Sequence, residues 1–277
     1  MLTPALIALA IISIFPLFYL IYISFFDFSL SVDNPTLCGF NNWIRMLKNP
    51  VFWESWGRTL IFASSGLVLE VLLGVGIALL LYNIPIANNF FLTMLIIPVF
   101  VAPVVAGLLA RFMLNSTYGL YSYVIQLLGN KTEIFGNTIT AMAAVIVVDV
   151  WEWTPLIMLI VFAGLQSMDT QPMEAASIDG ANYWQKIRYI IFPRLLPTIG
   201  IAALIRSMDI LRYVDVIKIL TAGGPANATK ISGYHLIEVA FRFQDFGGAA
   251  VQGIIMIAIT VFLGKVFIKL MGKGGNI

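Results

Sequence analysis

Residues 165–197 read LQSMDTQPMEAASIDGANYWQKIRYIIFPRLLP, and they lie between two long apolar segments of the chain. Thr170 is suited to cap a first short helix, and Gly180 is suited to close it, because glycine readily adopts the left-handed conformation found after a helix end. A second helix is expected over residues 183–192 and is expected to stop at Pro193. The stretch therefore predicts two short helices joined by a tight corner at a membrane surface.

The corner combines small side chains with one early acidic residue. Glu174 falls in the first turn, where the positive end of the helix dipole stabilises a carboxylate. The small residues expected on the exposed corner are Ala175, Ala176, Gly180 and Ala181. Small side chains let the surface of another protein approach closely. The same pattern also fits an amphipathic hairpin that only reconnects two spans, and the residues alone leave both interpretations open.

The composition places the rest of the chain in lipid. The 277 residues are 60% hydrophobic and 11% charged, with a mean hydropathy of +0.94, whereas soluble domains carry about 25% charged residues. The net charge of +2 argues against a nucleic-acid partner. Cys38 is the only cysteine, so no internal disulfide can form. These values predict an all-α, polytopic integral membrane protein.

Six apolar stretches are each long enough to cross a bilayer as a helix. They cover residues 4–26, 60–82, 90–114, 139–162, 196–220 and 248–271. An even number of crossings puts both termini on one side of the membrane. Basic residues divide six against seven between the two sets of loops, so the positive-inside rule does not decide which side is the cytoplasm.

Two expected spans carry ionisable residues near mid-membrane, where charge is expensive and marks function. One face of the fourth span holds Asp149, Glu152 and Trp153, and the fifth span brings Arg206, Asp209 or Ile210, and Tyr213 to one face. Carboxylates and a guanidinium suit sugar hydroxyls, because each makes paired hydrogen bonds, and aromatic faces suit the C–H side of a sugar ring. Alternatively, Asp149 or Glu152 pairs with Arg206 or Arg111 and only pins helices together. Glu70 is expected to be a packing or water-cavity carboxylate, and His235 is given no role.

Three motifs resemble a known family. EAA followed by DGA, and then by Pro193 and Pro197, resembles the EAA loop of permease subunits in binding-protein-dependent ABC importers. LTAGGP at 220–225, with Thr229 four residues after the proline, is similar to a loop of the sugar permeases of the maltose and glycerol-phosphate uptake type. AFRFQDFGGAAV at 240–251 is similar to the entry of their last helix.

The resemblance implies a type I importer permease fold with six transmembrane helices, in one transmembrane domain over residues 1–277. Residues 165–197 would be its cytoplasmic coupling loop. The residues implied in coupling to the ATPase are Glu174, Ala175, Ala176, Asp179, Gly180 and Ala181. The residues implied along the substrate path are Asp149, Glu152, Trp153, Arg206, Asp209, Ile210 and Tyr213.

The resemblance also implies partners. They are a second permease subunit in a heterodimer, two ATP-binding subunits, an extracytoplasmic substrate-binding protein met by residues 40–56 and 221–244, and membrane lipid. The sequence contains no phosphate-binding loop, metal-ligand spacing or nucleophile constellation. We therefore expect no enzymatic activity, no catalytic residue, no metal and no cofactor on this chain, with ATP and Mg²⁺ on the partner ATPase.

The expected function is that of a permease subunit of an ATP-driven sugar importer in a prokaryotic cell membrane, with both termini cytoplasmic. One alternative is an ion-coupled secondary transporter of a small polar solute, in which Asp149, Glu152 and Asp209 titrate. Another is an ABC permease for glycerol phosphate or a polyol. A structural membrane subunit or a membrane enzyme is a further alternative, in which Asp149 and Arg206 would be dispensable for transport.

Overall fold

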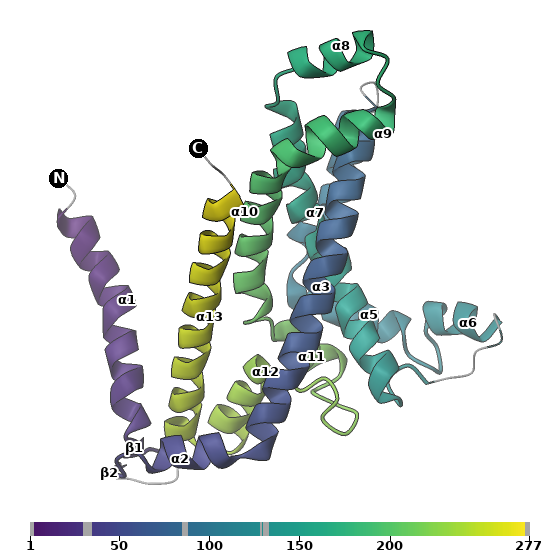
Figure 1. The fold of residues 1–277 in the computed structure, drawn as a ribbon. Coiled ribbons are helices and arrows are strands. Elements are labelled where there is room, and N and C mark those ends of the chain that lie inside the picture. Colours follow the sequence, from purple (N-terminus) through teal and green to yellow (C-terminus); the bar gives the residue numbers. More distant parts are fainter. Residues whose placement is uncertain (1–2, 30–34, 85–87, 128, 130–132, 275–277) are drawn as a thin grey trace. The chain divides into compact units, whose positions relative to one another are not determined.

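The computed structural model describes residues 3–29, 35–84, 88–127, 129 and 133–274, and most of them are helical (Figure 1). The strands in this described part are β1 (Phe26–Asp27) and β2 (Thr36–Leu37), which pair antiparallel. The first helices are α1 (Thr3–Ser24), α2 (Asn41–Lys48), α3 (Pro50–Tyr82), α4 (Asn88–Ile96), the 3-10 helix η1 (Ile97–Phe100), α5 (Pro103–Met113), α6 (Leu120–Leu127) and α7 (Thr138–Gln166). The later helices are α8 (Gln171–Ile178), α9 (Tyr183–Lys186), the π-helix η2 (Ile187–Ile191), α10 (Phe192–Ile210), α11 (Asp215–Leu220), α12 (Ser232–Ile237), the π-helix η3 (Glu238–Arg242) and α13 (Phe246–Gly274).

Four helical segments of the described chain are long and apolar enough to cross a membrane. They are Pro50–Tyr82, Thr138–Gln166, Tyr183–Ile210 and Phe246–Lys269. A bent pair, Phe90–Phe100 with Pro103–Met113, adds a fifth if it counts as one span, and the part of α1 over Leu9–Ser24 is a shorter apolar helix. The all-α membrane fold is confirmed, and this arrangement is consistent with the six expected crossings.

The third expected span, 90–114, is not a straight helix. It breaks at Val101 and Ala102, which are extended, and its two halves meet at 94°. Proline explains the break, because Pro103 disfavours the helical conformation in the residue before it. Taken together, the two halves are still long and apolar enough to cross a membrane.

The fifth expected span, 196–220, was wrong at both ends. Helix α10 ends at Ile210, and α11 is a separate short helix that packs against α5. The residues buried in this packing are Val216, Ile217 and Leu220. They are apolar because they lie inside the protein, and they do not continue a membrane span. At the other end, the helix does not stop at Pro193.

A π-turn carries the helix through Pro193. The amide of Phe192 donates to the carbonyl of Ile187, five residues back, and Pro193 sits in the first turn of α10. The wider turn accommodates a ring that would collide with a carbonyl in a regular α-helix. The helix that begins in the 165–197 segment is therefore continuous with the membrane helix α10.

The segment between the first two expected spans is shorter than expected, because α3 begins at Pro50 and not near residue 60. Phe52, Ser55 and Thr59 are buried on one side of this added helix. On its outer side Arg58 pairs with Glu54 at 3.0 Å, four residues earlier. The same segment holds the short helix α2. Of the residues between the second and third expected spans, 85–87 lie outside the described chain.

The contacts divide the chain into two compact units, Met1–Thr59 with Lys230–Leu263 and Leu60–Thr229 with Gly264–Ile277. The first unit has its core at Met46, Phe52, Val239, Ala240, Ala249 and Val251. The second holds the whole 165–197 segment and both predicted mid-membrane faces. A single transmembrane domain over the whole chain stays a prediction.

Inside the second unit, glycines on α3 allow close helix packing. A Cβ atom at Gly66 would lie 2.9 Å from Ile210 Cδ1, and one at Gly74 would lie 2.9 Å from Ile157 Cγ2 and 3.1 Å from the Met158 amide nitrogen. Both spacings are too short for a side chain. Helix α3 therefore lies directly against α7 and α10 at these two positions.

We predict that Gly74→Ala lowers the free energy of unfolding by about 1–3 kcal/mol, because the added methyl overpacks the contact with α7. The midpoint of thermal unfolding in detergent should fall accordingly. Gly76→Ala is the matched control, since nothing lies within 4 Å of a Cβ there, and alanine favours a helix over glycine. Its midpoint should stay level or rise. Equal shifts in the two variants would contradict the packing argument.

Candidate functional site

The 165–197 segment folds as a braced hairpin of α8 and α9. Helix α8 closes on Gly180, whose φ is +77°. The Ala181 amide donates to the Ala176 carbonyl at 2.9 Å, and the Gly180 amide donates to Ser177 at 3.2 Å, which together form a Schellman motif. Thr170 occupies the expected cap position without a side-chain cap. The Asp169 carboxylate instead accepts from the Gln171 amide at 3.1 Å.

The second helix of the hairpin is capped and tied to the first. Asn182 and Gln185 form a reciprocal capping box, with bonds of 2.9 and 2.7 Å. Lys186 Nζ donates to Ser177 Oγ at 2.6 Å, which joins α9 to α8. The hairpin is therefore held in shape by its own hydrogen bonds.

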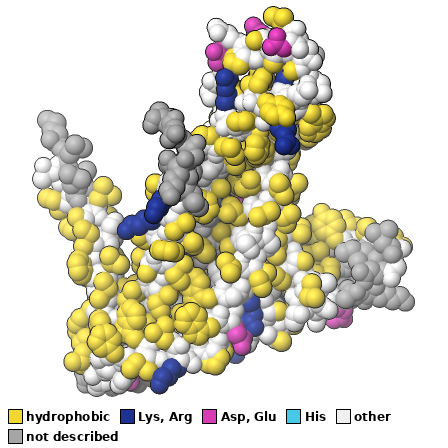
Figure 2. All heavy atoms as spheres, viewed as in Figure 1, with side chains coloured by type: hydrophobic (Ala, Val, Ile, Leu, Met, Phe, Trp, Pro, Cys, Tyr) yellow, Lys and Arg dark blue, Asp and Glu magenta, His cyan; other side chains and the backbone are white. Residues whose placement is uncertain are grey.

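The structure brings the six predicted coupling residues to this one hairpin. Glu174, Ala175, Asp179 and Gly180 are exposed, and Ala176 and Ala181 are partly buried. Charged side chains gather over the hairpin, whereas hydrophobic ones cover the helices that lead to it (Figure 2). Two large apolar side chains, Ile178 and Trp184, are 88% and 75% exposed. Uncovered apolar surface on a polar hairpin is typical of a protein-binding surface.

A second cluster joins the interior of α3 and α7 to the end of α10 near Ile210. Arg206 donates from Nε and Nη2 to the two oxygens of Glu70 at 2.8 and 2.9 Å, and from Nη2 to Asp149 Oδ1 at 2.5 Å. All three side chains are fully buried. The guanidinium also lies 5.0 Å from the Trp153 ring and 5.9 Å from the Tyr213 ring.

Most of the predicted substrate-path residues meet in this cluster. Tyr213 Oη donates to Glu152 Oε2 at 2.7 Å, and Ile210 is buried beside Gly66. Asp209 is the exception, because it pairs with Arg212 at 2.9 Å with both side chains substantially exposed. Asp149 forms an ion pair with Arg206, as expected if these residues join helices. Whether any of these residues touches cargo stays a prediction.

Glu70 was missed as a member of the cluster. The sequence did carry a signal, since Glu70 is the one carboxylate in the apolar stretch 60–82. A mid-membrane carboxylate calls for a partner. Its partner, however, is 136 residues away along the chain, so local periodicity did not identify the pair.

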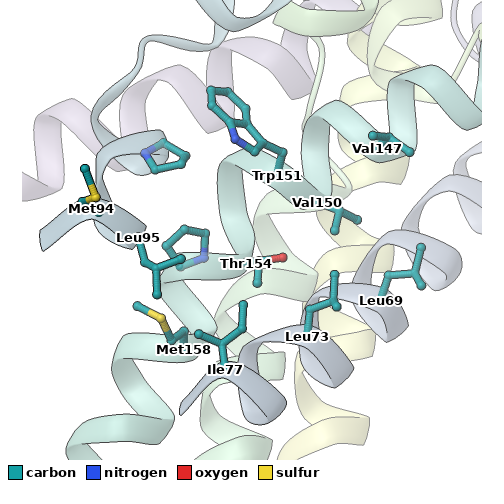
Figure 3. Close-up of a pocket in the computed structure, with 12 residues that line it drawn as sticks. Leu69, Leu73, Ile77, Met94, Leu95, Val147, Val150, Trp151, Thr154 and Met158 are labelled. Carbon is teal, nitrogen blue, oxygen red and sulfur yellow. The ribbon is translucent and has the colours of Figure 1, made fainter. Parts of the chain in front are cut away.

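The opposite face of α7 borders an apolar cavity of about 550 Å³ between α3, α4, η1 and α7. Figure 3 shows Trp151, Val147 and Thr154 of α7 around the same space as Leu69 and Leu73 of α3 and Met94 of α4. Thr154 brings a hydroxyl to a wall that is otherwise hydrocarbon, thioether, indole and proline. The buried cluster and this cavity thus occupy different sides of one helix.

The loop that follows α11 is held in an unusual conformation. Ala222, Ala226 and Asn227 have positive φ values of 48°, 46° and 63°, which L-residues rarely adopt. Thr229 is fully buried, donates to the Gly224 carbonyl at 2.9 Å and shares a hydrogen bond with Thr221 at 2.6 Å. The predicted Thr229 motif position is therefore the brace of this loop.

In the first unit, a buried polar network ties α12 to α13. His235 Nδ1 lies 2.9 Å from Gln252 Oε1, and Gln252 Nε2 donates to the Ser232 carbonyl at 2.7 Å. Arg45 pairs with Asp245 at 2.7 Å, which joins α2 to the residue just before α13. His235 was given no role from sequence, yet it is a buried link between α12 and α13.

Burial sets the protonation of this network. Burial, aided by the charge of Lys230, lowers the pKa of His235 below 6.5, against the opposing effects of the Gln252 hydrogen bond and the Glu238 charge. Burial alone would raise the pKa of Glu238, but hydrogen bonds and charges of Lys230 and Arg242 outweigh it and lower that pKa below 4.5. The folded protein thus favours a neutral His235 beside a charged Glu238.

Comparisons with known proteins agree on one family. The family model for the binding-protein-dependent transport system inner membrane component matches residues 70–274. A probable ABC transporter permease protein of Sinorhizobium fredii is 32% identical over 264 residues, covering 95% of this chain and 85% of that protein. A trehalose/maltose transport system permease protein of Thermococcus litoralis is 30% identical, covering 95% of this chain and 88% of that protein.

A solved structure shares the fold. In the crystal structure of a bacterial ABC transporter involved in import of the acidic polysaccharide alginate, one chain matches with a TM-score of 0.87. The match is 19% identical and covers 99% of this chain and 94% of that one.

We predict that the free energy of unfolding falls as the pH is lowered through 6.5, because the unfolded state then binds a proton that buried His235 resists. His235→Asn places an amide donor near the Nδ1 position and removes this titration. Thermal unfolding in detergent between pH 7.5 and pH 5.5 should show a smaller loss for the variant. Parallel profiles would contradict the assignment to His235.

Proposed function

This chain belongs to the family of binding-protein-dependent transport system inner membrane components, and on that premise we propose that it is the permease subunit of an ATP-driven importer of uncharged sugars. The hairpin of α8 and α9 is the observation that carries the proposal. It is braced by its own hydrogen bonds, it joins α7 to α10, and it exposes small residues and two large apolar side chains. A rigid projection at the end of two membrane helices suits a cleft in a partner ATPase.

The alternatives fit this geometry less well. An ion-coupled secondary transporter has no use for a braced hairpin of this kind. Two of the groups that would titrate in such a transporter are already in ion pairs, Asp149 with Arg206 and Asp209 with Arg212. A sugar permease is further supported by the trehalose/maltose relative, whose match covers nearly all of this chain.

The charges in the spans support uncharged cargo. Among the described residues of α3, α7 and α10 at this depth, Arg206 is the cation, and two carboxylates already hold it. A phosphate or carboxylate on cargo at this depth would lie near Glu152 and Asp149 while that cation is already engaged, which is unfavourable at low dielectric. Sugar hydroxyls need hydrogen bonds and aromatic faces instead. Of the alternatives, this favours a sugar or polyol over glycerol phosphate.

The remaining partners follow from the same proposal. A binding protein delivers the cargo to the outer segments 40–56 and 221–244, a second permease completes the path, and two ATPase subunits carry ATP and Mg²⁺. Both termini then face the cytoplasm together with the hairpin. The chain itself transports and does not catalyse a reaction.

We predict that Gly180→Arg lowers ATP-dependent uptake at least about tenfold in proteoliposomes that contain the complete transporter. The arginine would block seating of the corner, since Gly180 is exposed and has open space around it. Gly180→Ala is the matched control, because it pays the same backbone strain at φ +77° and adds only a methyl group. Uptake driven by a proton gradient without ATP would contradict the importer.

We also predict that the transporter imports neutral sugars and rejects their anionic forms. Matched pairs, such as trehalose with trehalose 6-phosphate and glucose with glucuronate, are compared in proteoliposome uptake. Only sugars that the binding protein retains are scored, which separates its selectivity from that of the membrane path. Comparable uptake of a retained anionic sugar would contradict uncharged cargo.

A further inference from the structure

Arg206 connects three helices through a single side chain. Its guanidinium, on α10, makes a two-point contact with Glu70 on α3 and a third contact with Asp149 on α7. A forked contact of this kind fixes direction as well as distance. Gly66 brings the backbone of α3 against the same place, since a Cβ there would lie 3.2 Å from Asp149 Oδ2. The three helices are thus joined at one depth.

Stability alone does not account for this cluster. Burying ions costs free energy, and replacing a buried ion pair with well-packed apolar residues is often neutral or stabilising. The best-attested use of such pairs is to specify one arrangement of the elements they join. The exposed pair of Arg212 and Asp209 joins two positions of one short segment, so it has no comparable effect on helix arrangement.

The location of the cluster gives that arrangement a purpose. At 1.5 Å per residue, the part of α7 between Asp149 and its end at Gln166 is about 26 Å long. The part of the continuous helix Tyr183–Ile210 between Tyr183 and Arg206 is about 34 Å long. Both helices end in the hairpin. A movement of the hairpin is therefore transmitted along both helices to the contacts of Arg206.

We propose that Arg206 is a positioning residue, which locks α3, α7 and α10 into one body so that movement of the hairpin is converted into movement of the cargo path. This inference rests on the proposed ATP-driven import. In this role the guanidinium does not bind cargo. It keeps the three helices in register while the hairpin moves.

The test compares a neutralised cluster with the wild type in the complete reconstituted transporter. In the variant Glu70→Met, Asp149→Leu and Arg206→Met, the cation and both of its carboxylate partners are removed together, while Glu152 keeps its hydrogen bond from Tyr213. We expect it to assemble and hydrolyse ATP while the number of sugar molecules imported per ATP falls at least about tenfold. Arg212→Met is the matched control, and its ratio should equal that of the wild type.

A second measurement follows the lock without ATP or cargo. In a Cys38→Ser background, nitroxide labels are placed at Leu80→Cys on α3 and Ile201→Cys on α10, both exposed positions. Electron spin resonance should give one narrow distance distribution for the wild type and a broad one for the neutralised variant. This measurement keeps its meaning even if the wild type shows no ATP-driven uptake, which would refute the proposed function instead.

Either a normal import ratio or a narrow distribution in the neutralised variant overturns the proposal. An equal loss in Arg212→Met also overturns it, because the effect would then not depend on the buried contacts. If the neutralised variant does not assemble, Arg206→Lys provides the same test, since lysine keeps the charge and loses the fork. We expect its import ratio to fall and its distance distribution to broaden, and wild-type values would overturn the proposal.

Discussion

The membrane part of this chain depends on how one buried guanidinium is neutralised. Arg206 has no exposed surface, so its charge is balanced by Glu70 and Asp149 rather than by water. Removing Arg206 would leave two buried carboxylates without their cation, which costs several kcal/mol. The contacts therefore constrain three helices together, and the glycines of α3 allow the backbone spacing that those contacts require.

The hairpin could be predicted because its signals are local. Gly180 ends α8 and Asn182 caps α9, and both act within a few residues of their own position. The expected role of Pro193 as a stop was wrong, because a π-turn absorbs the proline. The rule that proline ends a helix applies to regular α-helical spacing. The helix Tyr183–Ile210 departs from that spacing where the hairpin joins α10.

The mid-membrane cluster could be predicted only in part. Periodicity along α7 correctly grouped Asp149, Glu152 and Trp153. On α10 it left Asp209 and Ile210 equivalent, since positions three and four residues apart share a face. Packing separates them, because Ile210 is buried while Asp209 pairs with Arg212. Glu70 required knowledge of which helix lies opposite, and that information is distributed over the whole chain.

The π-turn at Ile187–Ile191 has a consequence for how the hairpin is aimed. A π-turn holds one residue more than the α-helical turn it replaces. Deleting one residue there would restore regular spacing while completing the same turn, whereas deleting one residue from the regular part of this helix would rotate everything before it by about 100° around the axis of α10. The π-turn therefore absorbs one residue of sequence without turning the hairpin around α10, so that a one-residue deletion redirects the corner when it falls in the regular part of the helix and not when it falls at Ile187–Ile191.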